Sequence, residues 1–364
     1  MKYIIRQWFT LVVFGILVFL AACGQASNNA TNNEPTGSDS DTQTETFTLK
    51  ASIQSPPKAA LSLGFDAYLD DIEAKSNGRI TFERYYGESL AKAADQLNAL
   101  SSGIADIALF VPSYVPGKLP LANVGTLPGL WSDSWVGAMS YHELYQAVPE
   151  LQAEMEKENV KWVGQYALPS YYIISSKEVK DFGDLKGLKV IATGQLAVLA
   201  EAMGATPVGI PITESYEAMQ RGTVDAVFYG LTASATYGLE EATKTIWKLP
   251  IGSSAGLIGM NIDVWNQLPE DLQQIIMEAA AAHPDSFYQI YEVEGDQAAL
   301  QKFIDAGAQI IEPTPEQIEQ LQAFTKPIWE KWVQEQEANG APGQKILDTF
   351  LELIEKNEQA HPHR

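Results

Sequence analysis

The part of the chain that decides the fold is residues 184–226, DLKGLKVIATGQLAVLAEAMGATPVGIPITESYEAMQRGTVDA. The turn 184–187 leads into a hydrophobic strand, and the turn 222–225 leads into the next one. Thr213 is placed to cap the helix that follows it. The predicted order is strand 188–192, helix 195–203, strand 207–210, helix 214–221 and strand 223–228. This alternation predicts an α/β protein whose strand ends open into a cleft.

The rest of the chain continues the alternation on both sides of this stretch. Strands are predicted at 47–53, 79–86, 104–111, 161–166 and 171–176, and helices at 61–76, 90–102 and 135–159. A long helical stretch runs from 268 to about 306 and is predicted to bend at Pro284. Short strands joined by helices of this length predict parallel sheets.

Composition limits the functions that are possible. The 364 residues include 46 acidic and 24 basic ones, for a net charge of −22. Without Lys2 and Arg6 of the first 22 residues the charge becomes −24, that is −22 − 2. Such a field repels nucleic acid and anionic lipid surfaces, so neither is expected as a partner. The length favours two domains, and 46% hydrophobic residues are enough for large cores.

The N-terminus predicts export and lipid attachment. Lys2 and Arg6 precede an apolar run at 8–20, which is too short to span a bilayer and is typical of a signal peptide. The sequence Leu-Ala-Ala before Cys23 resembles a lipobox, which predicts cleavage after residue 22 and lipidation of Cys23. The alternative is an ordinary signal peptide followed by a chance cysteine.

The segment after Cys23 has a different composition from the rest. Residues 24–46 are almost entirely polar and cannot bury a core, so residues 23–46 are predicted to be a lipid-anchored, disordered tether. Cys23 is the only cysteine, which excludes a disulfide framework. The expected location is extracytoplasmic, at the outer face of the cell membrane.

Five motifs in order carry a family resemblance. The chain resembles the solute-binding proteins of tripartite ATP-independent periplasmic (TRAP) transporters, the DctP type, from residue 47 to about 356. The motifs are DLKGLKV at 184–190, MGATP at 203–207, PITESYEAMQRG at 211–222, TVDA at 223–226 and LPEDLQ at 268–273.

The resemblance implies a fold, a function and partners. It implies a two-lobed periplasmic-binding-protein-like (class II) α/β fold, with a hinge and a long helix underlying both lobes. Domain I would comprise 47–168 plus 256–297, and domain II 169–255 plus 298–364. The function implied is capture of a small organic solute, typically an organic acid, and its delivery to membrane permease subunits, without catalysis.

The chain departs from the family pattern where the ligand is held. In the family an arginine that pairs with a substrate carboxylate follows the DLKGLK[IV] motif, and here this position is Ile191. A second family arginine falls on Tyr171, and a family asparagine falls on Tyr229. A small misalignment is the alternative explanation. These departures lead to the hypothesis of an aromatic-lined pocket for a neutral, partly apolar or cationic solute.

The candidate ligand-binding residues follow from this hypothesis. They are Phe110, Tyr114 and Trp131 from domain I, and Tyr171, Tyr172, Ile191, Glu214, Phe228 and Tyr229 from domain II. For each aromatic residue, packing in the core or hinge is the alternative. For Glu214 the alternative is an acid in the first turn of a helix, which the helix dipole favours.

Other functional classes have weaker support. Residues 252–256, GSSAG, match the G-x-S-x-G motif of serine hydrolases, but a strand rather than a helix is predicted after Ser254. Ser254→Ala would test this alternative through loss of esterase activity. No metal-ligand set or phosphate loop is evident, so no cofactor is expected. A neighbouring ATPase gene would favour an ABC-type binding lipoprotein, and neighbouring kinase genes would favour an extracellular sensor partner.

Overall fold

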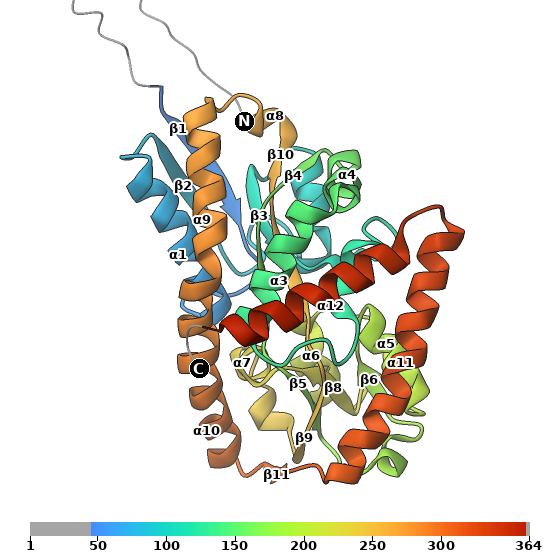
Figure 1. Ribbon diagram of the computed structural model, residues 1–364. Helices are drawn as coiled ribbons and strands as arrows, with labels where there is room; N and C mark the ends of the chain where they lie inside the picture. The colour runs from blue at the N-terminus through green and yellow to red at the C-terminus, as the bar shows by residue number, and fades with distance from the viewer. Residues whose placement is uncertain (1–44, 362–364) are drawn as a thin grey trace, which may run out of the picture. The chain divides into compact units, whose positions relative to one another are not determined.

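The computed structural model describes residues 45–361 of the chain, within a compact unit that begins at Thr44 (Figure 1). The predicted signal peptide, Cys23 and nearly all of the predicted tether lie outside the described residues. Helices and strands alternate along the described chain, which confirms the predicted α/β class. Two separate sheets organise it, and we call each sheet with its covering helices a lobe.

The first lobe is built on a five-stranded sheet of order β2-β1-β3-β10-β4. Its strands are β1 (Phe47–Ser52), β2 (Ile80–Tyr85), β3 (Ile107–Phe110), β4 (Val160–Ala167) and β10 (Ala255–Asn261). Every residue of β3 and β10 is buried, as expected for central strands covered on both faces. The helices that belong to this lobe are α1 (Ala60–Lys75), α2 (Gln96–Ser101), α3 (Ser134–Ala147), α4 (Pro149–Lys157), α8 (Ile262–Trp265) and α9 (Glu270–Tyr288).

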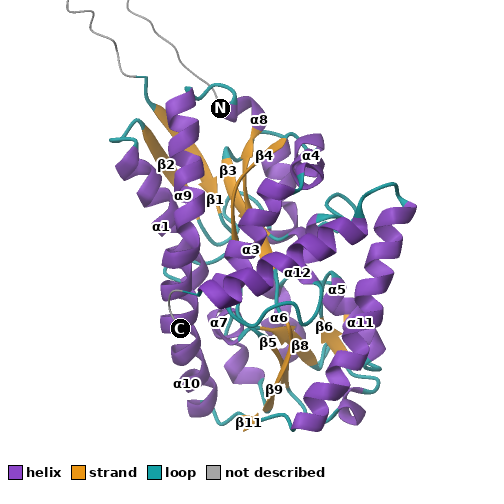
Figure 2. Ribbon diagram, viewed as in Figure 1, coloured by secondary structure: helices purple, strands orange, loops and turns teal. Residues whose placement is uncertain are grey.

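The second lobe is built on a six-stranded sheet of order β11-β9-β5-β8-β6-β7. Its strands are β5 (Tyr171–Ser175), β6 (Lys189–Ile191), β7 (Thr206–Val208), β8 (Ala226–Tyr229), β9 (Thr245–Gly252) and β11 (Gln309–Ile311). The helices around it are α5 (Gln195–Ala202), α6 (Ser215–Gln220), α7 (Leu231–Thr236), α10 (Gln297–Asp305) and α11 (Pro315–Ala338). Figure 2 shows the two groups of strands apart from one another, with helices around each.

The chain passes between the sheets in three places. Residues 168–170 lead from β4 to β5, and residues 253–254 lead from β9 back to β10. The third passage is one long helical stretch, α9, the π-helical segment η7 (Gln289–Asp296) and α10. Because α9 packs on β4 and α10 on α7, this stretch runs along both lobes, as predicted.

Several sequence predictions were wrong in detail. The sheets are mixed, because β10 and β5 enter their sheets directly from the other lobe, without a crossover helix, and pair antiparallel with their neighbours. The predicted helix 135–159 is two helices, separated at Val148, and Pro149 begins the second one. Thr213 does not cap α6, because a short 3-10 turn ending at Glu214 precedes that helix.

The last helix, α12 (Gly343–Ala360), packs on the first lobe. Asn357 donates to Ser140 Oγ of α3 at 3.1 Å, and the ring of Phe350 lies 5.7 Å from that of Tyr141. The same helix also packs on α11 of the second lobe, so the predicted assignment of residues 298–364 to domain II stays a prediction. The other predicted domain boundaries stay predictions, since residues 44–364 form a single compact unit.

Candidate ligand-binding site

A cavity lies where the edges of the two sheets meet. On the side of the first lobe it is lined by residues that follow β1 and β3 and that end β4: Gln54, Ser55, Val111, Ser113, Tyr114 and Tyr166. These three strands run in the same direction, so their carboxyl ends lie at one edge of the sheet. Ser254, just before β10, reaches the same edge because β10 runs the opposite way.

The second lobe closes the other side of the cavity. Phe228 and Tyr229 end β8, Thr193 follows β6, and Tyr171 begins the antiparallel strand β5. Tyr291 of η7 and residues of α7 complete this wall. The two sheets thus present their carboxyl edges to one space. The strands β5 and β10, which follow the crossings between the lobes, begin at this space.

The lining carries no charged group. It consists of Gln54, Ser55, Leu61, Val111, Ser113, Tyr114, Thr126, Tyr166, Leu168, Tyr171, Thr193, Leu196, Ile212, Phe228, Tyr229, Ala233, Thr236, Tyr237, Ser254 and Tyr291. None of these side chains is acidic, basic or a histidine, and six are tyrosines. The free space that these side chains enclose is small, less than the about 150 Å³ of a cavity that holds benzene.

Direct hydrogen bonds join the lobes around the cavity. The hydroxyls of Ser113 and Thr193 lie 2.9 Å apart, and those of Tyr114 and Tyr229 lie 3.1 Å apart. The amide of Gln195 donates to Thr126 Oγ1 at 3.2 Å. Gly194 has a φ of 57°, and a Cβ there would lie 2.8 Å from Thr126 Oγ1, so a glycine permits this close approach. The structure is therefore a closed arrangement of the lobes.

The tyrosines of the cavity remain neutral. Burial raises the pKa of Tyr114, Tyr171 and Tyr291 well above the ordinary value of 10.0, and that of Tyr237 to about 12. Desolvation is the main cause in each case, because it disfavours the phenolate. Each hydroxyl can thus donate one hydrogen bond and accept others.

Two of the three positions that depart from the family pattern lie side by side in the cavity. The rings of Tyr171 and Tyr229 are stacked, with centroids 5.2 Å apart and planes at 29°. Ile191 is different: it is fully buried in β6, paired with Val227, and does not line the cavity. The structure therefore brings together Tyr114, Tyr171, Phe228 and Tyr229 of the predicted set.

The other predicted residues lie outside the cavity lining. Phe110 ends β3 inside the core, against Gly259. Trp131 is buried behind the wall, and its Nε1 donates to the carbonyl of Leu168 at 3.1 Å. Tyr172 is half-buried next to Tyr171 on β5, where burial raises its pKa to about 12. Glu214 is exposed on an outer groove with Glu217 and Arg221.

Sequence reasoning missed several lining residues. Gln54, Ser113, Tyr166 and Thr193 each lie at or just beyond the carboxyl end of a predicted strand, and this position was the signal that could have found them. Tyr166 also needs Gly256, because a Cβ there would lie 2.1 Å from the tyrosine ring. Tyr291 had no local signal, since its direction depends on the π-helical segment.

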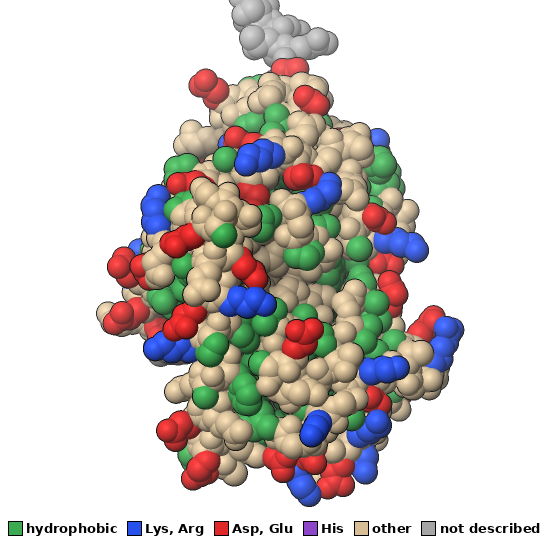
Figure 3. Space-filling model, turned by 90° about the vertical axis from the view of Figure 1, so that its right-hand side faces the viewer, with side chains coloured by type: hydrophobic (Ala, Val, Ile, Leu, Met, Phe, Trp, Pro, Cys, Tyr) green, Lys and Arg blue, Asp and Glu red, His purple; other side chains and the backbone are tan. Residues whose placement is uncertain are grey.

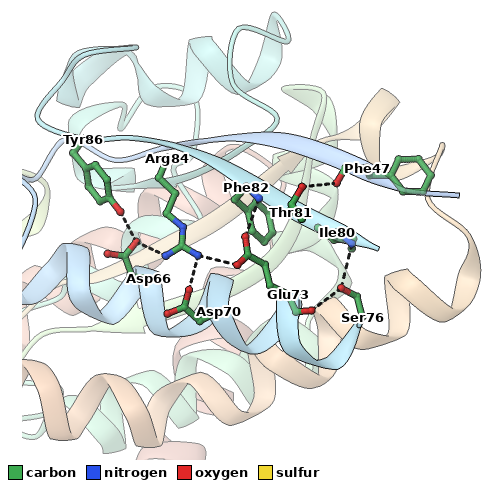
Figure 4. A network of polar contacts seen from close by, with 10 residues as sticks. All are labelled: Phe47, Asp66, Asp70, Glu73, Ser76, Ile80, Thr81, Phe82, Arg84 and Tyr86. Carbon is green, nitrogen blue, oxygen red and sulfur yellow. Dashed lines mark hydrogen bonds and ion pairs between the residues drawn. The ribbon is translucent and has the colours of Figure 1, made fainter. Parts of the chain in front are cut away.

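The described arginines are engaged elsewhere. Figure 4 shows Arg84 beside α1, where its guanidinium pairs with Asp66 at 3.1 Å and with Glu73 at 3.4 Å, and also contacts Asp70. Arg79 pairs with Asp271, and Arg221 with Glu217 at 2.9 Å. On the face shown in Figure 3, acidic and basic side chains are likewise interspersed. None of the three arginines between residues 45 and 361 reaches the cavity lining.

The surroundings of Ser254 differ from those of a hydrolase nucleophile. The residue lies between β9 and β10, so the strand-turn-helix that such a serine requires is not formed here. No histidine is among the residues that line the cavity with it. Within 45–361 there is no cluster of three or more His, Cys, Asp or Glu side chains that could hold a metal ion.

Comparison with known sequences decides the family. Residues 52–336 match the bacterial extracellular solute-binding proteins of family 7, DctP. This chain belongs to that family. The predicted TRAP-type relationship is confirmed, and so is the two-lobed fold, since TRAP solute-binding proteins are among the structural neighbours. No helix in the described part of this DctP-family chain has the length and hydrophobicity of a membrane span.

Individual relatives are distant in sequence. A solute-binding protein of Albidiferax ferrireducens is 27% identical over 58% of this chain, and the match spans 63% of that protein, a little under two thirds. The ectoine-binding periplasmic protein TeaA of Halomonas elongata is 26% identical over 79% of this chain and 83% of its own length.

Solved structures share the fold. A TRAP solute-binding protein of Rhodoferax ferrireducens, in complex with benzoate, has a TM-score of 0.81 at 22% identity, covering 86% of this chain and 99% of its own. One from Bordetella bronchiseptica with bound mandelate has a TM-score of 0.77 at 24% identity, covering 85% and 99%.

Proposed function

We propose that this chain is the extracytoplasmic solute-binding component of a TRAP-type secondary transporter. It captures a small organic solute between its lobes and delivers it to membrane permease subunits. The observation that carries this proposal is the enclosed cavity between the two sheet edges, with hydroxyl contacts such as Ser113 to Thr193 across it. The ligands named for relatives, among them ectoine, benzoate and mandelate, are small organic molecules.

Binding and closure are one process in this proposal. A solute that contacts both lobes stabilises the closed state in proportion to its extra contacts there. The permease subunits would then recognise the closed form. The crossings at 168–170 and 253–254 and the long helical stretch 270–305 are the segments that must absorb the motion. No bond of the solute is broken, so the protein acts without catalysis.

We further propose that a lipid on Cys23 holds the protein at the outer face of the cell membrane, with the polar residues after it as the tether. Metabolic labelling with a radioactive fatty acid should mark the wild-type chain and leave Cys23→Ala unlabelled. Equal labelling of both chains would contradict the anchor and would leave solute binding untouched.

The binding function is tested by thermal unfolding of the purified protein with a panel of small solutes. The panel contains aromatic acids, keto acids, sugar acids, dicarboxylates, polyols, amides and amines, each at saturating concentration. A solute at 100 times its Kd adds about 2.7 kcal/mol to the free energy of unfolding. For a protein of this size the midpoint should rise by a few degrees. A panel without any shift would contradict the proposed function.

A further inference from the structure

The cavity holds a buried hydrogen-bond acceptor without a partner. Gln54 follows β1 and is only 4% exposed, yet its Oε1 meets no donor among the described residues. An amide oxygen left buried and unpaired is destabilising, because it has lost its hydrogen bonds to water without replacement. Since Gln54 lines the cavity, an N–H or O–H group of a bound solute is the natural partner for this oxygen.

The cavity lining contains no ionised side chain that could pair with a net charge. Its lining contains only apolar, hydroxyl and carboxamide side chains. Moving an unpaired ion into such surroundings costs several kcal/mol. Aromatic faces offset part of this cost for a cation, and hydroxyl donors offset part of it for an anion, but neither supplies an opposite charge. The balance therefore favours a solute without net charge.

The remaining wall suits a flat apolar group. Tyr171 and Tyr229 present a stacked pair of rings, and Phe228 and Leu196 add apolar surface. The neutral tyrosine hydroxyls around the pair can donate to an acceptor of the solute, such as a carbonyl oxygen.

We propose that this cavity takes a small, uncharged organic solute that carries an N–H or O–H donor for Gln54 Oε1 and a flat apolar part for the tyrosine rings. Amides, lactams and phenols have this chemistry, whereas carboxylates do not. This inference rests on the proposed solute-binding function and names the class of solute.

The test compares solutes of nearly the same shape and different charge. Benzamide, benzoate and benzamidinium are the first set, and mandelamide with mandelate and pyroglutamamide with pyroglutamate are further pairs. Each is titrated against the wild-type protein by thermal unfolding and by calorimetry. The expected result is that the uncharged amides bind at least tenfold more tightly than their carboxylates. Methyl benzoate, which lacks a donor, should bind more weakly than benzamide.

The possible outcomes separate this inference from the proposed function. Carboxylates or benzamidinium binding as tightly as the amides would overturn the inference and would leave solute binding standing. No binding by any probe in the series or in the wider panel would count against both.

A pair of variants tests the role of Gln54. Gln54→Leu removes the acceptor and should weaken amide binding about three- to tenfold, which is the worth of one neutral hydrogen bond. Its effect on methyl benzoate should be much smaller. Gln96→Leu is the matched control, because Gln96 is also buried with an unpaired Oε1 but lies outside the cavity lining. Equal losses for both variants, or none for Gln54→Leu, would contradict the proposed contact.

Discussion

The hydroxyl of Tyr114, from the first lobe, lies 3.1 Å from the hydroxyl of Tyr229 at the end of β8 in the second lobe. Tyr114 also accepts a hydrogen bond from the amide of Ile212 at 3.4 Å. Both contacts cross between the lobes, so they exist only when the lobes are together. The pair therefore stabilises the closed arrangement relative to one in which the lobes are apart.

Tyr114→Phe should weaken solute binding without weakening either lobe. The loss of a cross-lobe hydrogen bond costs the closed state about 1 kcal/mol, so the Kd should rise about three- to tenfold. Calorimetry with a solute from the panel measures this change. Tyr86→Phe is the control, because the Tyr86 hydroxyl donates to Asp66 at 2.8 Å within the first lobe. If both variants changed the Kd equally, the cross-lobe contact would not be the cause.

A disulfide between positions 113 and 193 should lock the lobes together. The hydroxyls of Ser113 and Thr193 are 2.9 Å apart, so sulfur atoms at these positions come within bonding reach after a small adjustment. In a Cys23→Ser background, oxidised Ser113→Cys/Thr193→Cys should neither take up nor release a labelled solute. Reduction should restore exchange, and each single variant should exchange like wild type. Rapid exchange by the oxidised double variant would contradict the closed arrangement.

Glu292 should make the stability of the protein depend on pH. Burial raises the pKa of its carboxyl from 4.5 to about 7, and the hydrogen bond from the Ser134 amide offsets only part of this rise. The folded state thus holds the proton more tightly than the unfolded state. The stabilisation is complete below about pH 4.5 and is lost as the pH rises through about 7. Thermal unfolding between pH 4.5 and 8 should show this decline.

Glu292→Gln should make the decline shallower, because the amide stays uncharged at every pH. Glu154 accounts for part of the remaining slope, since burial raises its pKa to about 7 as well, against hydrogen bonds from the amides of Leu121 and Ala122. The double variant with Glu154→Gln should therefore be the least dependent on pH. The exposed Glu319→Gln serves as the control. An unchanged slope in the double variant would show that other groups govern it.

Local pattern was enough to predict much of the fold and a part of the site. Apolar residues recur with one period in strands and another in helices, so β6, α5 and β8 were predicted close to their observed bounds. Tyr171 and Tyr229 were found because motifs on each side fix their positions in the family pattern. They then meet in space because β5 and β8 are neighbours.

The missing part depends on long-range packing. The antiparallel insertion of β5 and β10 follows from the crossings between lobes, which leave no periodic signal of their own. Gln54 was missed because polar residues are common in the turns that follow strands, so its position alone did not indicate a binding site. Phe110 was included because a buried strand end and a cavity wall have the same composition, and Ile191 because it occupies the position of the family's arginine. In the structure Phe110 packs against Gly259, and Ile191 pairs with Val227. These contacts place both side chains in the core rather than in the cavity wall.

Restoring an arginine at position 171 should change the class of solute that is bound. Tyr171 is buried in the cavity wall, where a guanidinium could pair with a carboxylate in bidentate fashion. Tyr171→Arg should therefore gain binding of benzoate or mandelate, by about tenfold or more over wild type, and lose affinity for the amides. Tyr172→Arg is the matched control, because successive residues of a strand point to opposite faces and Tyr172 lies outside the cavity lining. A Tyr171→Arg variant that unfolds cooperatively but binds no carboxylate would contradict this prediction. It would show that the missing cationic partner does not determine which solute is bound.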